Sequence, residues 1–395
     1  MHTIIKYSIF CILFLAMILF LKSCGSSAPK DVIDLTREDV VSVHDFFSEI
    51  SIVMPETHPD YFIATISTVE YHKGKYYIFD SKSQKVFCVN KDGRFKFKIS
   101  AQGHGPGEYV YIGHMSIDRF NDQILLLEPS MQRLQAFDME GKHAVTYNIT
   151  AEVPLAYNYA FALNADTLLL LSITGDQLIF FCRDRLEIIQ TEFPMAIADG
   201  VFPFLPSYMN FYQFNNKSFF LPVLSQHVAD ITHMLPKLYY SWDFGPYNNS
   251  EKQYERLFYE LASAGTDVFY KLPHDFIGRG KTINHTILKA SETTRYKIAI
   301  VEFDADYKNV IIDKKEGTYY VFRGFKEGIS LMHLNIFDNM AMGSAADLDR
   351  VPRAFRHRIL SRFHPSVLNE ADRLRLKNWD EMRDNMFFVF YKFKE

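Results

Sequence analysis

The 395-residue sequence predicts an all-β protein, a six-bladed β-propeller of four-stranded antiparallel blades. Two observations lead to this fold class. Short apolar runs rich in β-forming residues alternate with polar turns through most of the chain. The chain also resembles itself at a shift of 48 residues, and a period of about 40–50 residues with four short strands is typical of a propeller blade. The two tryptophans are too few for WD40 or kelch repeats.

The clearest repeat pairs residues 74–94 with residues 122–142 without a gap. Each copy has an apolar run ending on an acid, a polar loop, a base, a second apolar run and an acid-glycine turn, which is a strong hairpin signal. The acid and the base are Asp80 and Lys85 in the first copy and Glu128 and Arg133 in the second. Catalysis rarely needs one copy per repeat, so we expect these pairs to be ion pairs across a hairpin.

Six blades account for the length of the chain. Five are expected at residues 63–100, 111–149, 157–193, 208–245 and around 298–322. The sixth is assembled from residues 329–337, 386–393 and 45–53. A blade that joins the two ends of the chain closes the ring and leaves no free sheet edges.

Two segments lack the strand pattern. Residues 249–264 place apolar side chains at helical spacing after an Asn-Ser start. Residues 366–384 carry a second apolar series among charged residues. We expect both to be helical insertions packed on the rim of the propeller.

The first residues have the pattern of a bacterial secretory leader. Residues 9–21 are apolar, but this run is shorter than the roughly 20 residues that span a bilayer, so a signal peptide is favoured over an uncleaved anchor. The sequence LKSC resembles a lipobox, in which Cys24 is acylated, although Lys22 replaces the usual small residue.

The predicted organisation follows from this leader. It comprises a signal peptide at residues 1–23, a polar tether at 24–37 and the propeller at 38–395. The protein is therefore expected in the cell envelope, as an outer-membrane lipoprotein facing the periplasm or the exterior.

Composition and motifs exclude several functions. A net charge of −4 and a pI near 6.4 argue against nucleic acid as a partner. The 14 histidines show no HExxH spacing, and there is no GxSxG nucleophile motif. We therefore predict no cofactor, no metal and no catalytic residue. Cys88 and Cys182 lie in apolar runs, where we expect buried, unpaired thiols.

The stretch QGHGPGEYV, residues 102–110, is glycine-rich but has neither the GxGxxG spacing nor the GK[ST] ending of a phosphate-binding loop. It lies between the fourth strand of one blade and the first strand of the next. Gly103, Gly105 and Gly107 would let its backbone pack closely on the blade, and Pro106 would stiffen it. We expect a structural return loop.

Strand direction places this loop on the same face of the propeller as the loops after Asp80 and Glu128. The return to the inner strand is expected to bring its last residues to the mouth of the central channel. A ligand bound on this face would contact His104, Glu108, Tyr109 and Tyr111.

The order of motifs resembles the six-bladed β-propeller lipoproteins of gut Bacteroidetes, a TolB-like and NHL-like group. The motifs are SVHDFFSEISIVMPET, YYIFDSKSQKVFCVNKDG, GHGPGEY, WDFG, VIIDKKEG and RDNMFFVFYKFK. The family usually has proline after the asparagine of the last motif, whereas Asn385 is followed by Met386. The resemblance implies the fold and an envelope location, and it implies little about activity.

Two functions remain. The first is a non-catalytic binding or scaffolding module for a glycan, a peptide or an envelope protein, held at the membrane by its lipid. The second is an envelope hydrolase or lyase with an active site in the central channel. The absence of a recognisable nucleophile, metal or carboxylate motif in the sequence favours the first.

Overall fold

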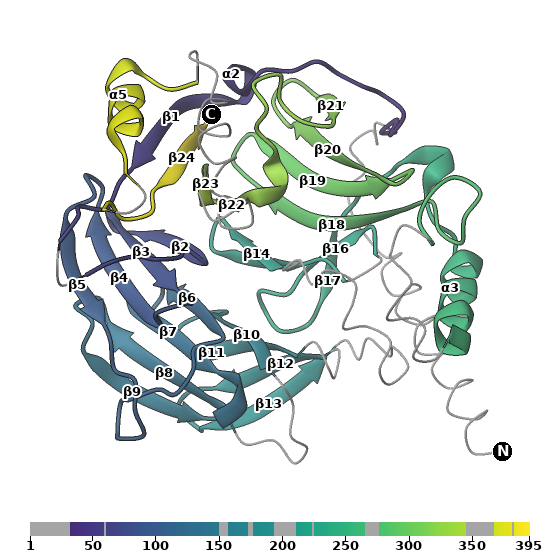
Figure 1. The fold of residues 1–395 in the computed structure, drawn as a ribbon. Helices are drawn as coiled ribbons and strands as arrows, with labels where there is room; N and C mark the ends of the chain where they lie inside the picture. Colours follow the sequence, from purple (N-terminus) through teal and green to yellow (C-terminus); the bar gives the residue numbers. More distant parts are fainter. Residues whose placement is uncertain are drawn as a thin grey trace.

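The structure, a computed structural model, describes residues 32–58, 61–149, 157–172, 177–192, 211–222, 225–264, 276–344, 367–380 and 383–395. Six four-stranded antiparallel sheets form the blades of a propeller, which confirms the predicted fold (Figure 1). The predicted signal peptide and Cys24 lie outside the described residues. Within these ranges no helix is long and apolar enough to cross a membrane.

Five blades are built from consecutive strands, with the first strand of each innermost. Blade one contains β2 (Thr68–His72), β3 (Lys75–Asp80), β4 (Lys85–Asn90) and β5 (Phe95–Ile99). Blade two contains β6 (His114–Asp118), β7 (Gln123–Glu128), β8 (Arg133–Asp138) and β9 (His143–Asn148). Blade three contains β10 (Tyr157–Ala162), β11 (Thr167–Ser172), β12 (Gln177–Cys182) and β13 (Glu187–Glu192).

Blade four contains β14 (Phe211–Phe214), β15 (Lys217–Phe220), β16 (His227–Asp230) and β17 (Lys237–Ser241). Blade five contains β18 (His285–Glu292), β19 (Tyr296–Phe303), β20 (Asp306–Asp313) and β21 (Thr318–Phe322). The inner strand β18 precedes the segment 298–322 whose pattern predicts this blade. The hydrophobic core is divided into clusters that lie between neighbouring blades, because each sheet buries side chains on both faces.

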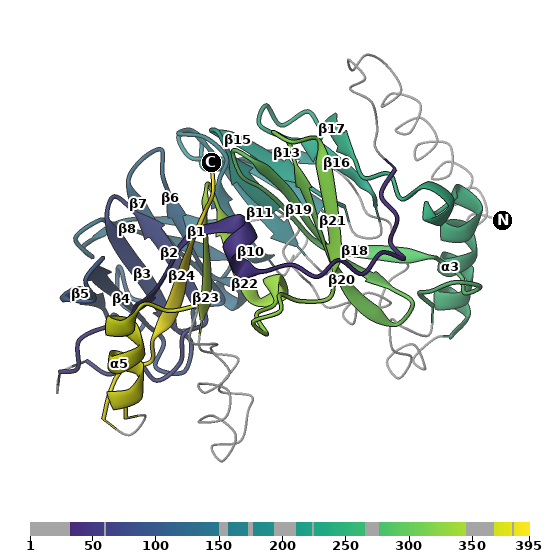
Figure 2. The ribbon, with the colours of Figure 1, turned by 90° about the horizontal axis from the view of Figure 1, so that it is seen from above.

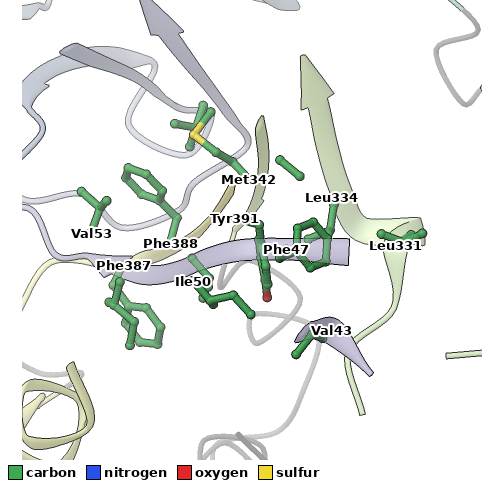
Figure 3. Close-up of a cluster of buried hydrophobic side chains, with 14 of the residues drawn as sticks. Val43, Phe47, Ile50, Val53, Leu331, Leu334, Met342, Phe387, Phe388 and Tyr391 are labelled. Carbon is green, nitrogen blue, oxygen red and sulfur yellow. The ribbon is translucent and has the colours of Figure 1, made fainter. Parts of the chain in front are cut away.

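Blade six joins the two ends of the chain, as expected (Figure 3). Its strands, from the inside outward, are β22 (Leu334–Phe337), β23 (Met340–Ser344), β24 (Phe388–Phe393) and β1 (Phe47–Val53). The C-terminal strand β24 thus pairs on both sides. Its Tyr391 faces Ile50 of β1, and its Phe390 faces Met342 of β23. The strand β23 was not predicted, because its Met-Ala-Met-Gly-Ser sequence has little β-strand character.

Two longer helices lie in the segments where the sequence predicts them. They are α3 (Glu251–Ala264) and α5 (Glu370–Asn378). Asn369 caps α5 by accepting a hydrogen bond from the Asp372 amide (2.8 Å), and the Asp372 carboxylate accepts one from the Ile52 amide of β1 (3.1 Å). The described residues also contain the short elements α2 (Val43–Phe46), η1 (Pro129–Met131), η2 (Gly245–Tyr247) and η5 (Leu331–His333).

The residues before α2 form a strap, which we define as residues 32–41, along the outside of blade five (Figure 2). Ile33 and Leu35 are buried in the core shared by blades four and five, with exposures of 1% and 0%. Residues 32–37 belong to the segment 24–37 that was predicted to be a tether. They are docked instead, because their two apolar side chains enter the core.

Candidate functional site

The glycine-rich loop closes on itself before the chain crosses to blade two. The Tyr109 amide donates to the Ala101 carbonyl (2.9 Å), and the Gly103 amide donates to the Tyr109 carbonyl (3.0 Å). The Glu108 carboxylate accepts a hydrogen bond from the Gly105 amide (2.7 Å). The segment from Ala101 to Tyr109 is therefore a compact loop stabilised by its own backbone and by one of its own side chains.

Close contacts explain why glycine stands at two positions of the loop. A Cβ atom on Gly103 would lie 2.0 Å from Oε2 of Glu108. Gly107 has a φ of +76°, and a Cβ atom there would lie 2.8 Å from the His143 ring on blade two. Both positions therefore exclude a side chain unless the neighbouring residue moves.

Tyr109 ties the loop to blade one. Its ring is fully buried, and its hydroxyl donates to the Gln84 carbonyl (2.8 Å) in the loop after Asp80. The loop thus lies on the predicted face. Burial raises the pKa of the Tyr109 hydroxyl to about 12, so this group stays protonated at neutral pH and acts as a hydrogen-bond donor.

The expected position of the last loop residues at the channel mouth is wrong. The Glu108 carbonyl accepts hydrogen bonds from Arg133 (3.1 Å) and Gln135 (2.9 Å), which belong to β8, the third strand of blade two. Tyr109 also lies beside Ile99, at the end of the outermost strand β5. The reason is that the loop closes on Ala101, so only the residues after Tyr109 cross to the inner strand.

The repeated acids hold the segments that enter the blades. The Ala64 amide, before β2, donates to Asp80 (2.9 Å), and the Val110 amide, before β6, donates to Glu128 (2.8 Å). Glu128 also forms the expected ion pair with Arg133 (2.6 Å). The other expected pair does not form between Asp80 and Lys85, both of which are described, because Asp80 accepts backbone amides instead.

The four residues suggested as ligand contacts differ in what they can offer. Tyr109 is buried, and the Glu108 carboxylate is bound within the loop. His104 and Tyr111 are exposed, Tyr111 to 54%. Only these last two present free ring surface to solvent.

A hollow of about 470 Å³ lies at the outer boundary between blades six and one. It was not anticipated from the sequence. Its lining residues are Glu56, His58, Tyr61, Phe95, Phe97 and Lys98. Three of these rings form a parallel column, with centroids 4.8 Å apart for His58 and Tyr61 and 3.8 Å apart for Tyr61 and Phe95. Its size is within the range of small-molecule sites.

A carboxylate stands beside this aromatic column. The Tyr61 hydroxyl donates to Oε1 of Glu56 (2.6 Å). This hydrogen bond lowers the pKa of Glu56, and a hydrogen bond from the Phe95 amide and electrostatic interactions with His58 and Arg94 act in the same direction. The hollow thus combines aromatic surface with an ionised acceptor and the ammonium group of Lys98.

Charged groups also lie on or beside the innermost strands. Arg119 contacts Oε2 of Glu70 on β2 (3.3 Å) and lies over the Phe337 ring of β22 (5.9 Å). Burial raises the pKa of Glu70. Burial lowers the pKa of Lys289 on β18 to about 8, because it disfavours the charged form of this group as well. The Lys289 ammonium donates to the Leu334 carbonyl. The charged groups of Arg119, Glu70 and Lys289 are therefore all bound to other parts of the chain.

Among the described residues, no three His, Cys, Asp or Glu side chains are grouped so that they could hold a metal ion. Cys88 is buried and Cys182 is partly exposed, and neither forms a disulfide. Cys88 thus agrees with the expectation of a buried, free thiol, whereas Cys182 is less buried than expected.

The fold defines the class of this protein as a six-bladed β-propeller with a closed N- and C-terminal blade. The chain belongs to a family described as Domain of unknown function (DUF4934), whose model matches residues 30–345. Comparison with curated proteins gives no match.

A solved structure shows the same fold at low sequence identity. A Bacteroides fragilis protein that is described provisionally as exported has a TM-score of 0.68 and 14% identity, with 92% of this chain and 100% of that chain covered. A DUF4221 member from Bacteroides vulgatus has a TM-score of 0.49 and 12% identity, covering 88% of this chain and 98% of that one. Identities this low support the fold and not the function.

Proposed function

We propose that the protein is an envelope lipoprotein, acylated at Cys24, whose propeller is a non-catalytic binding or scaffolding module for a glycan, peptide or protein partner. The observation that carries the proposal is the hollow between blades six and one. It offers aromatic rings, a carboxylate and an ammonium group, a combination that suits a ligand with both apolar and polar surfaces.

The location rests on the leader and the LKSC motif, and the Bacteroides fragilis protein of the same fold is itself described provisionally as exported. We expect Cys24→Ala to abolish incorporation of labelled palmitate and to release the protein from the membrane fraction. Unchanged labelling would show that the lipobox assignment is wrong.

The exposed residues near the glycine loop provide a second surface for the same function. His104 and Tyr111 lie on the face that strand direction assigns to the return loops. Glu108 and Tyr109 would act there by shaping the loop, because their polar groups are bound within the protein.

One experiment separates the two surfaces. Binding of the full chain to defined oligosaccharides and peptides is measured by calorimetry for His58→Ala and His104→Ala, which remove matched, exposed imidazoles from the hollow and from the loop. We expect a ligand that binds the wild type to be weakened by His58→Ala and not by His104→Ala. Loss with His104→Ala alone would assign the loop, and no loss with either variant would contradict both surfaces.

A further inference from the structure

The strap fixes where the chain enters the propeller. The Ile33 amide donates to the Asp243 carbonyl of blade four (2.8 Å). Further along, the Asp39 amide donates to the Val321 carbonyl of β21 (2.8 Å), and the Asp39 carboxylate accepts from the Val321 amide (2.8 Å). The strap is therefore attached by hydrogen bonds to blades four and five, whose shared core it enters.

Its first residue lies next to the segment that leads into α3. A Cβ atom on Gly245, in η2, would lie 2.5 Å from Cγ1 of Val32. Only a few residues separate this glycine from the start of α3 at Glu251. The chain consequently joins the propeller at the rim of blades four and five, beside α3.

This docking leaves a short connection to the predicted acylation site. Cys24 and Val32 are eight Cα–Cα steps apart, so their separation cannot exceed about 28 Å. A flexible chain of this length has a root-mean-square span of about 16 Å. A propeller of this size has a radius of gyration of about 20 Å, so the connection is shorter than the propeller is wide.

We propose that the rim of blades four and five, with α3, is the surface of the protein that faces the membrane, with the lipid bilayer as its partner. The proposal rests on acylation at Cys24. Exposed apolar side chains on this side agree with it: Val32 is 49% exposed, Leu235 between β16 and β17 is 62% exposed, and Tyr259 on α3 is 76% exposed. Tyrosine is favoured at membrane interfaces because its ring is apolar and its hydroxyl polar.

The order of the blades places the candidate ligand surfaces away from the bilayer. The glycine loop, between blades one and two, lies three blades around the ring from the boundary of blades four and five, which is the opposite side. The hollow, between blades six and one, lies two blades away. Both surfaces would remain accessible to a partner while the protein is anchored.

The test uses the lipidated full chain in liposomes, in a Cys182→Ser background that removes the partly exposed thiol. A fluorescent donor is attached at Lys252→Cys on α3 or at Lys142→Cys on blade two, both exposed positions, with an acceptor on the lipid headgroups. We expect energy transfer to be several-fold greater from position 252. Equal transfer, or greater transfer from position 142, overturns the orientation.

A change in the length of the connection between Cys24 and Val32 tests whether this short connection causes the orientation. Twenty Gly-Ser residues inserted after Ser27 should reduce the difference between the two positions, whereas the same insertion after Glu395 should preserve it. A difference that survives the first insertion overturns the tether argument. Flotation of the wild type and of Cys24→Ala with liposomes measures the anchor separately: failure of the wild type to float overturns the anchor, while flotation with equal transfer overturns only the orientation.

Discussion

Arg183 and Asp118 form an ion pair across the boundary between blades two and three, with 2.6 Å between Nη2 and Oδ2. Both side chains are buried, at 6% and 0% exposure. Asp118 also accepts the Phe120 and Asn121 amides of the turn between β6 and β7, so the pair joins this turn of blade two to the turn between β12 and β13 of blade three. A buried carboxylate that loses its partner is strongly unfavourable.

We therefore expect Arg183→Met to lower the free energy of unfolding by about 3–5 kcal/mol, because it leaves Asp118 buried and unpaired. The control is Arg185→Met, which removes an exposed pair with Glu187 (2.9 Å) and should cost less than about 1 kcal/mol. Urea unfolding of both variants measures the difference. Equal losses would show that the buried pair has no special role.

Two buried histidines should make the fold sensitive to acid. Burial lowers the pKa of His114 and of His285 to about 4. In the unfolded chain these groups titrate near about 6.5, so the unfolded state binds more protons below that pH. Stability should consequently be complete above about pH 6.5 and be lost as the pH falls toward 4, by up to about 1.4 kcal/mol per pH unit for each histidine.

His114→Asn tests this dependence. Asparagine retains an acceptor for the Ala160 amide, which contacts Nδ1 of His114 (3.4 Å), but it does not titrate in this range. The free energy of unfolding, measured in urea at pH 7, 5.5 and 4.5, should fall less steeply in the variant. An unchanged slope would contradict the assignment to His114.

Two glycines with the same φ separate backbone strain from close contact. Gly74, in the turn between β2 and β3, and Gly107 both have a φ of +76°, but a Cβ atom on Gly74 would meet nothing within 4 Å. Gly74→Ala should cost about 1 kcal/mol through its unfavourable φ. Gly107→Ala should cost more, because its Cβ atom also meets His143. Thermal melts compare the two, and equal shifts would show that the loop contact is unimportant.

Deletion of residues 386–395 should destabilise the whole propeller, because it removes β24 from between β23 and β1. Phe388 and Tyr391 are buried in the intact protein, so their removal also exposes the apolar residues that pack against them. Removal of Glu395 alone, which is exposed, is the control. Even about 1 kcal/mol shifts the melting temperature of a large domain by about 2–4 °C, so a melt unchanged by the longer deletion would refute this role of β24.

The class of fold and the closure of the ring could be predicted from the sequence. The 48-residue repeat and the alternating apolar runs are local patterns, and the apolar C-terminal run needs a partner wherever it lies. The weak strand β23 and the inner strand β18 were missed because their places depend on the strands beside them. Strand pairing across the chain, not local preference, decides such segments.

The candidate binding surfaces, by contrast, depend on contacts between segments that are far apart in the chain. The repeated pattern of an acid and a base predicts an ion pair for Asp80. In the structure Asp80 instead accepts hydrogen bonds from backbone amides, including the Ala64 amide in the segment that enters blade one. The column of His58, Tyr61 and Phe95 joins the connection between β1 and β2 to the outermost strand β5 of blade one, so no spacing in the chain reveals it. The strap mixes apolar and charged residues, and it docks because the boundary between blades four and five buries Ile33 and Leu35. Such contacts depend on which blades become neighbours, which is set when the ring closes.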